Sequence, residues 1–468
     1  MGLSDPAPAC ILIRIAHVET FNLAFSRIMD FISLVRGLIG LTAILGLAYL
    51  ASNNKRAISW RMVGTALAMQ VVLAIFLLKG GDMGEFFSPL GWPKMFFSWV
   101  SGFFVLVLNF TTAGAVFIFG DLAKSPGTEG SMGMFFAFQV LPTIIFFGAL
   151  MSVLYHLGLM QKVVQGMAWA MSRLLGTSGA ESLSVTANIF VGQTEAPLVI
   201  RPYLGSMTMS ELMAVMTGGM ATIAGGVMAA YIQILGDPYA QAMGVSLEAG
   251  RLLFAEQLLG ASIMAAPAAL LLAKMLIPED KEPVTMGNVR IEVEQTSANV
   301  IDAAASGASD GLKLSLNVGA MLLAFLALIA MLNYTIGWGA GLFGFSLSLE
   351  QLMGWGLSPL AWLIGIPTAD VFAFGSLLGT KIIANEFVAY LNLAGQIAAG
   401  TLSPKTIMMA TFALCGFANL SSIAIQIGGI GPLAPERTSD LAKLGVRAVL
   451  AGTFANLMTA TIAGMMTG

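Results

Sequence analysis

Long apolar runs separated by short polar segments dominate this sequence. Runs of about 20 residues, the length that an α-helix needs to cross a bilayer, predict eight membrane spans. They cover residues 31–50, 62–78, 134–158, 209–235, 251–277, 312–333, 405–428 and 438–466. Residues 82–133 alternate aromatic-rich runs with turn residues, and we interpret them as interfacial helices with a loop. The pattern therefore predicts an all-α polytopic membrane protein.

Two regions, 160–203 and 368–400, carry too many charged residues to be ordinary spans. Each is followed by a span that is interrupted in its middle, at Met220–Tyr231 and at Cys415–Ile425, and then by a closing span. This repetition of the same order of segments indicates an internal duplication.

The basic residues orient the chain in the membrane. Lys55, Arg56 and Arg61 lie in one short loop, which marks that loop as cytoplasmic. Counting crossings from this loop gives the two duplicated units opposite orientations. Inverted repeats with paired interrupted segments are typical of secondary transporters, and those segments point to the binding site.

The composition excludes most other classes of protein. Charged residues make up 10% of the 468 residues and hydrophobic residues 57%, which excludes a soluble enzyme. A net charge of -3 argues against a nucleic-acid partner, and Cys10 and Cys415 show no zinc or disulfide spacing. The chain carries no HExxH or P-loop motif, so we expect no enzyme.

Glu195 and Glu386 occupy matched positions in the two polar regions. A carboxylate at membrane depth is costly unless it is paired or faces water. Either glutamate alone could lie at the membrane surface, but two in matched positions argue against coincidence. The neighbouring Gln, Thr and Asn side chains offer donors and acceptors without positive charge, which suits a neutral solute with hydroxyl and amide groups.

The interruption of the first repeat predicts a cation site. Gly225 and Gly226 loosen the helix and free backbone carbonyls, and Thr222 adds a hydroxyl. Together with the turn at 188–191, this is a neutral set of oxygen ligands that suits Na⁺ better than a soft metal. Ordinary packing of small residues is the alternative interpretation.

Four long segments closely resemble the signature segments of the concentrative nucleoside transporters. They read, in order, ANIFVGQTEAPLVIRPYL, GGMATIAGGVMAAY, ANEFVAY and ALCGFANLSSIAIQIGGIGPLAPER, and the resemblance extends from about Met29 to the end of the chain. It implies about eight transmembrane helices, two re-entrant helical hairpins, a homotrimer, and a transport domain that moves like an elevator against a scaffold domain.

The resemblance implies a role for each matched residue. The first hairpin would hold the nucleobase through Gln193, Thr194 and Glu195, with Val227 packed against the base. The second hairpin and the second interrupted helix would hold the ribose hydroxyls and line the pocket through Glu386, Asn419, Ser422 and Phe417. The coupling ion would be bound by the side chains of Asn188 and Thr222 and the carbonyls of Val191 and Ile223.

The expected organisation has six segments. They are an N-terminal extension (1–28, with Met29 as the expected natural start), scaffold and interfacial helices (29–158), a first transport repeat (159–277), a polar cytoplasmic linker (278–311), a scaffold helix with a connector (312–367) and a second transport repeat (368–468).

The function implied by the resemblance is nucleoside import driven by sodium, for example of uridine. The protein would be a multi-pass protein of the bacterial cytoplasmic (inner) membrane, surrounded by lipid, with Na⁺ as coupling ion and no organic cofactor. Proton coupling is an alternative, because proton-coupled members of the family exist. A channel-type pore is disfavoured, because the chain shows neither a ring of charges nor a filter loop.

Overall fold

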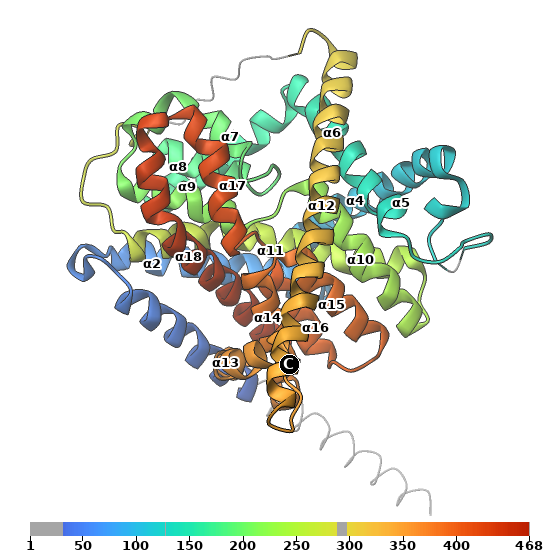
Figure 1. The fold of residues 1–468 in the computed structure, drawn as a ribbon. Helices are drawn as coiled ribbons and strands as arrows, with labels where there is room; N and C mark the ends of the chain where they lie inside the picture. The colour runs from blue at the N-terminus through green and yellow to red at the C-terminus, as the bar shows by residue number, and fades with distance from the viewer. Residues whose placement is uncertain (1–30, 127, 288–296, 468) are drawn as a thin grey trace, which may run out of the picture.

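Helices make up almost all of the chain in the computed structural model, which describes residues 31–126, 128–287 and 297–467 (Figure 1). The N-terminal extension 1–28 and the expected start at Met29 lie outside the described residues. The described residues form no strand, and their single β contact is an isolated bridge between Ser178 and Met286.

The described residues form eighteen α-helices. In chain order they are Phe31–Leu50, α2 (Trp60–Ala74), α3 (Gly80–Phe86), α4 (Ser88–Phe119), α5 (Phe136–Gln139), α6 (Leu141–His156), α7 (Leu159–Leu175), α8 (Gly179–Ala187), α9 (Met209–Ala221), α10 (Gly225–Met243), α11 (Leu247–Leu276), α12 (Val300–Gly341), α13 (Leu349–Leu363), α14 (Val371–Ile383), α15 (Glu386–Ala398), α16 (Pro404–Leu414), α17 (Leu420–Ile430) and α18 (Thr438–Met466).

In the part of the chain that the structure describes, eight helices are long and apolar enough to cross a membrane. They are Phe31–Leu50, Trp60–Phe86, Ser88–Ala123, Phe136–His156, Met209–Met243, Leu247–Leu276, Val300–Gly341 and Pro435–Met466. Seven of them coincide with predicted spans. The remaining predicted span, 405–428, consists of two helices of 11 residues each, α16 and α17, on either side of the predicted interruption.

The eighth apolar helix, Ser88–Ala123, lies where the sequence predicts interfacial helices with a loop. Most of this segment is the single helix α4. Pro89 and Pro93, which suggested turns, both lie near its N-terminal end, so the apolar run continues as one helix to Phe119. In place of the predicted interfacial helices, the structure has one long apolar helix here, and the loop begins only after this helix.

The apolar helices fall into two groups by burial. The apolar windows of Met209–Met243, Leu247–Leu276 and Pro435–Met466 are 83–89% buried, whereas those of the other five are 17–33% buried. The interrupted helix α9–α10 and the closing helices α11 and α18 therefore form the centre of the molecule. The other helices cover it and turn apolar side chains outward, as expected for a chain that is solvated by lipid.

Glycines bring α6 and α12 into backbone contact at the periphery. A Cβ atom on Gly148 would lie 2.7 Å from the Gly307 carbonyl oxygen, and one on Gly311 would lie 2.8 Å from the Cα of Ile145. Small residues allow membrane helices to approach this closely. The long helix α12, which Figure 1 shows crossing the whole molecule, is attached through this contact.

Two units with the same order of elements contribute the helices of the centre. The first consists of α8, a turn, the 3₁₀ helix η4 (Ala196–Ser206), the interrupted helix α9–α10 and α11. The second consists of α14, a turn, α15, the interrupted helix α16–α17 and α18. Figure 1 shows α17 of the second unit beside α9 of the first, and a hydrogen bond from Gln426 to the Met216 carbonyl joins the two helices.

One hydrogen bond occurs in both units with its donor and acceptor exchanged. In the first unit, the N-cap residue of α8, Ser178, donates to Glu211 in the first turn of α9 at 2.6 Å. In the second, the N-cap residue of α14, Asp370, accepts from Thr406 in the first turn of α16 at 2.7 Å. The equivalent positions support the internal duplication that the sequence predicts.

The Asp370 carboxylate is the acceptor of a small network. Oδ2 accepts hydrogen bonds from the backbone N–H and hydroxyl of Ser403 and from the hydroxyl of Thr406. Burial acts to raise the pKa of Asp370, but these hydrogen bonds outweigh it and hold the pKa below its ordinary value. A group with a depressed pKa stabilises the fold above its unfolded pKa, and this contribution is lost as the pH falls through the folded value.

We expect Asp370→Asn to lower the free energy of unfolding by about 1–3 kcal/mol at neutral pH, the value of hydrogen bonds to a charged acceptor. The double variant Asp370→Ser, Thr406→Glu should recover much of the loss, because it reproduces the Ser178–Glu211 pair. Thermal unfolding of the detergent-solubilised protein measures both. Asp82→Asn is the control, since this carboxylate is 76% exposed in its pair with Lys79 and should contribute little. A double variant less stable than Asp370→Ser alone would contradict the equivalence.

Candidate functional site

The interruptions of the two broken helices lie against each other. Gly416, between α16 and α17, has a φ of 114°, which favours glycine. A Cβ atom at this position would also come within 2.6 Å of the carbonyl oxygen of Ala221, the last residue of α9. Glycine fits both this conformation and this contact, and the two interruptions therefore touch through their backbones at Gly416.

Lys381 of α14 holds the ends of both broken helices. Its side chain is fully buried, and its ammonium donates to the Ala413 carbonyl at 2.9 Å and to Asn456 Oδ1 at 2.8 Å. Asn456 of α18 in turn donates from Nδ2 to the Ala221 carbonyl at 2.7 Å. A cation is favourable at the C-terminal end of a helix. The single ammonium therefore stabilises the end of α16 directly and the end of α9 through Asn456.

Glu386 is the buried carboxylate of the site. It is the first residue of α15, it is 4% exposed, and Asn385 caps the helix in front of it. One carboxylate oxygen accepts from the Tyr231 hydroxyl at 3.0 Å and the other from Asn419 Nδ2 at 2.8 Å. The positive end of the helix dipole also favours an anion at this position. The structure thus places Glu386 inside the protein, and the interpretation as a surface glutamate is wrong for this residue.

Asn419 joins Glu386 to the start of α17. While its Nδ2 donates to Glu386, its Oδ1 accepts from the Ser422 backbone N–H at 2.9 Å and from the Ser421 hydroxyl at 2.7 Å. This is the N-cap arrangement, in which a side-chain oxygen satisfies the free N–H groups of a helix start. The same asparagine therefore terminates the interruption and fixes the carboxylate.

The turn between α8 and η4, which is the tip of the predicted first hairpin, reaches the same cluster through Gln193. Its Nε2 donates to the Ser422 hydroxyl at 3.3 Å, and its Oε1 accepts from Gln426 at 3.0 Å. Thr194 packs against Gly429 of α17. Four predicted site residues from three different elements are thus linked by hydrogen bonds in one buried cluster, which we call the polar cluster: Gln193, Ser422, Asn419 and Glu386.

The structure does not bring Glu195 into the polar cluster. Its side chain is exposed and folds against Gly192 within the hairpin tip. Val227 is buried on α10, one turn before Tyr231, and Phe417 is half-buried in the interruption between α16 and α17. The two glutamates that the sequence matches therefore have different environments.

The predicted cation ligands are neutral oxygens at the other side of the first hairpin turn. Asn188 is buried and donates to the Ser184 carbonyl at 3.1 Å, while no described residue donates to its buried Oδ1. Thr222 uses its hydroxyl hydrogen on the Gly218 carbonyl at 2.8 Å, which leaves the lone pairs of Oγ1 for another partner.

A backbone hydrogen bond connects the two halves of this ligand set. The Gly225 N–H, at the start of α10, donates to the Phe190 carbonyl in the hairpin turn at 3.0 Å. No described backbone N–H donates to the carbonyls of Val191 or Ile223. The unpaired Asn188 oxygen and these carbonyls fit a hard cation such as Na⁺, which prefers oxygen ligands.

Tyr231 and Gln426 contact the polar cluster, and neither residue was predicted from the sequence. Each lies four residues after a predicted site residue, Tyr231 after Val227 on α10 and Gln426 after Ser422 on α17. Residues four apart share a helix face. Polar residues at this spacing are the signal that could have identified both.

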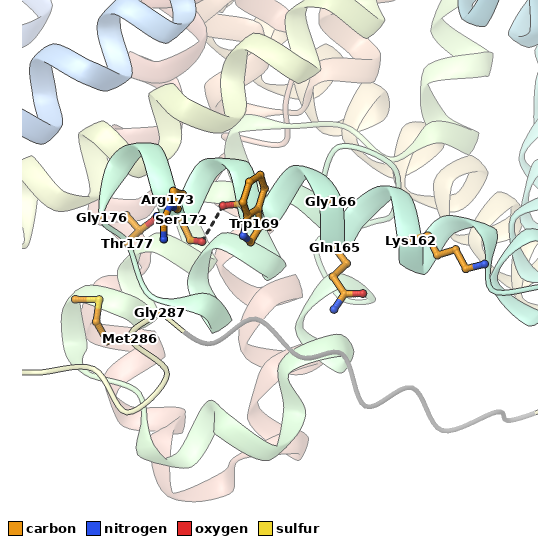
Figure 2. A pocket seen from close by; sticks show the side chains of 10 residues that line it. All are labelled: Lys162, Gln165, Gly166, Trp169, Ser172, Arg173, Gly176, Thr177, Met286 and Gly287. Atoms are coloured by element: carbon orange, nitrogen blue, oxygen red, sulfur yellow. Dashed lines mark hydrogen bonds between the residues drawn. The ribbon is translucent and has the colours of Figure 1, made fainter.

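A separate cavity of about 680 Å³ lies along α7 and contains none of the predicted site residues (Figure 2). Figure 2 shows Lys162, Trp169 and Arg173 along this helix, with Met286 and Gly287 of the following linker on the other side. The lining is an open helix face, and we assign it no role in the site.

Three family profiles match successive parts of the chain. The profile described as Na⁺ dependent nucleoside transporter N-terminus matches residues 39–122, the one described as nucleoside recognition matches 137–238, and the one described as Na⁺ dependent nucleoside transporter C-terminus matches 257–464. The nucleoside recognition profile and the C-terminal profile together cover every predicted site residue.

Similar proteins match over nearly their whole length. The uncharacterized transporter YutK of Bacillus subtilis is 46% identical over 92% of this chain and 98% of its own. The nucleoside permease NupC of Helicobacter pylori is 42% identical over 92% of this chain and 97% of its own. The solved structure of CNTnw in an inward-facing substrate-bound state is 43% identical, covers 93% of this chain and 98% of its own, and has a TM-score of 0.80.

Proposed function

Because the chain belongs to the Na⁺-dependent nucleoside transporter family and is an integral multi-pass membrane protein, we propose that it is a secondary active symporter that imports nucleosides across the cytoplasmic membrane with the sodium gradient. The observation that carries the proposal is the polar cluster, in which neutral donors and acceptors surround one buried carboxylate. A neutral solute with hydroxyl and amide groups can exchange for these internal hydrogen bonds.

The two hairpins would hold different parts of the nucleoside. Glu386 and Asn419 would bind the ribose hydroxyls, because a carboxylate is a strong acceptor for O–H donors and both residues already form part of one buried network. Gln193 and Thr194 would contact the nucleobase, with Val227 and Phe417 as apolar surfaces. Glu195, which is exposed here, would have to turn toward the base when a nucleoside binds.

Sodium would bind where the first hairpin turn meets the interruption of α9–α10. Asn188 Oδ1, Thr222 Oγ1 and the carbonyls of Val191 and Ile223 would be its ligands, and the unpaired Asn188 oxygen supports this placement. One Na⁺ that crosses 100 mV supplies about 2.3 kcal/mol, and a tenfold gradient adds about 1.4 kcal/mol. The sum would concentrate a neutral nucleoside on the order of several hundredfold, without an ATP site.

We further propose an elevator-like movement of the two repeats against the peripheral helices, in a homotrimer of the bacterial inner membrane. The separation of a buried centre from a less buried periphery supports two bodies, and the sequence resemblance supports the trimer.

Uptake of labelled uridine into proteoliposomes under an imposed sodium gradient tests the function. We expect saturable uptake that requires an inward sodium gradient, because transport of a neutral solute needs the coupled ion. Uptake that follows a proton gradient instead would establish proton coupling, and flux that rises linearly with uridine concentration would contradict the symporter and indicate a pore.

Glu386→Gln should weaken uridine binding about tenfold or more, since the ribose hydroxyls lose a charged acceptor. Calorimetry on the purified variant measures the affinity. Glu256→Gln is the control, because this carboxylate is paired with Lys94 at the contact between α4 and α11 and should leave binding unchanged. An affinity equal to that of the wild type would remove Glu386 from the ribose site.

Thr222→Ala should raise the sodium concentration needed for half-maximal uptake several-fold, because one oxygen ligand is lost. Thr461→Ala provides the matched control, since Thr461 is also fully buried and also bonds the carbonyl four residues before it but lies on α18. If both variants keep the sodium dependence of the wild type, Thr222 is not a ligand.

A further inference from the structure

Gln426 lies next to the polar cluster and contacts Gln193, the residue that we propose binds the nucleobase. It is fully buried on α17. Its Nε2 donates one hydrogen bond to Gln193 Oε1 at 3.0 Å and one to the Met216 carbonyl of α9 at 3.0 Å. One amide nitrogen with two hydrogens thus serves a backbone group and a site residue together.

This arrangement fixes the orientation of the Gln193 amide. The two ends of a glutamine amide are told apart only by the groups around them, and a backbone carbonyl can only accept a hydrogen bond. Met216 therefore requires the NH₂ group of Gln426 on its side, and the second hydrogen of that group requires the oxygen of Gln193. The NH₂ group of Gln193 is left to face Ser422, to which it donates at 3.3 Å.

The packing around the two amides leaves room for this contact. A Cβ atom on Gly219 of α9 would lie 2.7 Å from Gln426 Nε2 and 2.8 Å from the Cβ atom of Gln193, so the pair depends on the absence of a side chain there.

The oxygen of the Gln426 amide makes no hydrogen bond to a described residue that would explain why a glutamine occupies this position. No described residue donates to its buried Oε1, and a buried polar atom without a partner destabilises a fold. An apolar side chain of similar size would fill the space without this cost. The NH₂ group is therefore the useful part of the side chain.

We propose that Gln426 is a positioning residue that determines base specificity. It holds the oxygen of Gln193 on its own amide, so that the NH₂ group, which donates to Ser422 here, is the end available to the nucleobase. The bases differ at C4, where the carbonyl oxygen of uridine would find a donor and the amino group of cytidine would meet another donor. The inference rests on the proposed role of Gln193 and adds the class of base that the site prefers.

Two substitutions change the orientation of Gln193 in different ways. Gln426→Leu removes the partner, so Gln193 can turn either end to the base. In Gln426→Glu, the new carboxyl group accepts a hydrogen bond from the Gln193 NH₂ group whether it is ionised or protonated. When it is protonated, its O–H donates to the Met216 carbonyl. The glutamate therefore turns the oxygen of Gln193 toward the base.

The experiment is competition of unlabelled uridine and cytidine against labelled uridine, by uptake in proteoliposomes and by binding to the full-length protein in detergent. The ratio of the cytidine to the uridine inhibition constant should be about 3–10 for the wild type, the effect of one neutral hydrogen bond. It should fall to about 1 in Gln426→Leu and below 1 in Gln426→Glu. General destabilisation would weaken both nucleosides together and leave the ratio unchanged.

Gln70→Leu is the matched control. Gln70 of α2 is also fully buried, donates to the Met264 carbonyl at 3.0 Å and has a buried Oε1 that no described residue contacts, yet it lies away from the polar cluster. Its ratio should equal that of the wild type.

The outcomes separate this inference from the proposed function. A wild-type preference for cytidine, or an unchanged ratio in both Gln426 variants while Gln193→Leu alters it, overturns the role of Gln426 and leaves nucleoside transport intact. A wild-type protein that binds neither nucleoside overturns both.

Discussion

Two helices end inside an apolar protein, and the rest of the site depends on how those ends are paired. Backbone carbonyls that are freed at membrane depth are costly without a partner. The buried ammonium of Lys381 and the amide of Asn456 supply the partners for α16 and α9. Because these side chains come from α14 and α18, the second hairpin and the closing helix are fixed relative to both interruptions.

In the polar cluster, too, single side chains form hydrogen bonds that link two or more elements. Asn419 caps α17 and also holds Glu386, Tyr231 links α10 to α15, and Gln426 links α17 to α9 and to the first hairpin. A change at one residue therefore reaches two elements, which is why substitutions beyond the solute contacts are expected to alter recognition.

Sequence patterns predicted the features that depend on membrane thickness and on the cost of buried charge. The length of the apolar runs predicted the positions of seven long helices. The free-energy cost of a carboxylate in lipid indicated that Glu386 has partners inside the protein, and this residue is buried. Features that depend on partners distant in the sequence were not predictable. Matched motifs gave no sign that Glu386 is buried while Glu195 is exposed. Nor does the sequence show that the ends of two helices meet at Lys381 and its partner Asn456. At α4, proline signals suggested turns that the helix start accommodates.

The direct hydrogen bond between Gln193 and Ser422 shows that two groups of the polar cluster can satisfy each other. Groups that can pair in this way do not need a chain of water molecules as partners when no solute is bound. A carrier returns to its starting conformation without a solute. The free-energy cost of this step is low only when the polar groups of the site do not carry water or ions across the bilayer. Hydrogen bonds within the site would thus reduce leakage of ions down their gradient. They also mean that the affinity for any solute depends on the difference in free energy between the hydrogen bonds within the site and those to the solute.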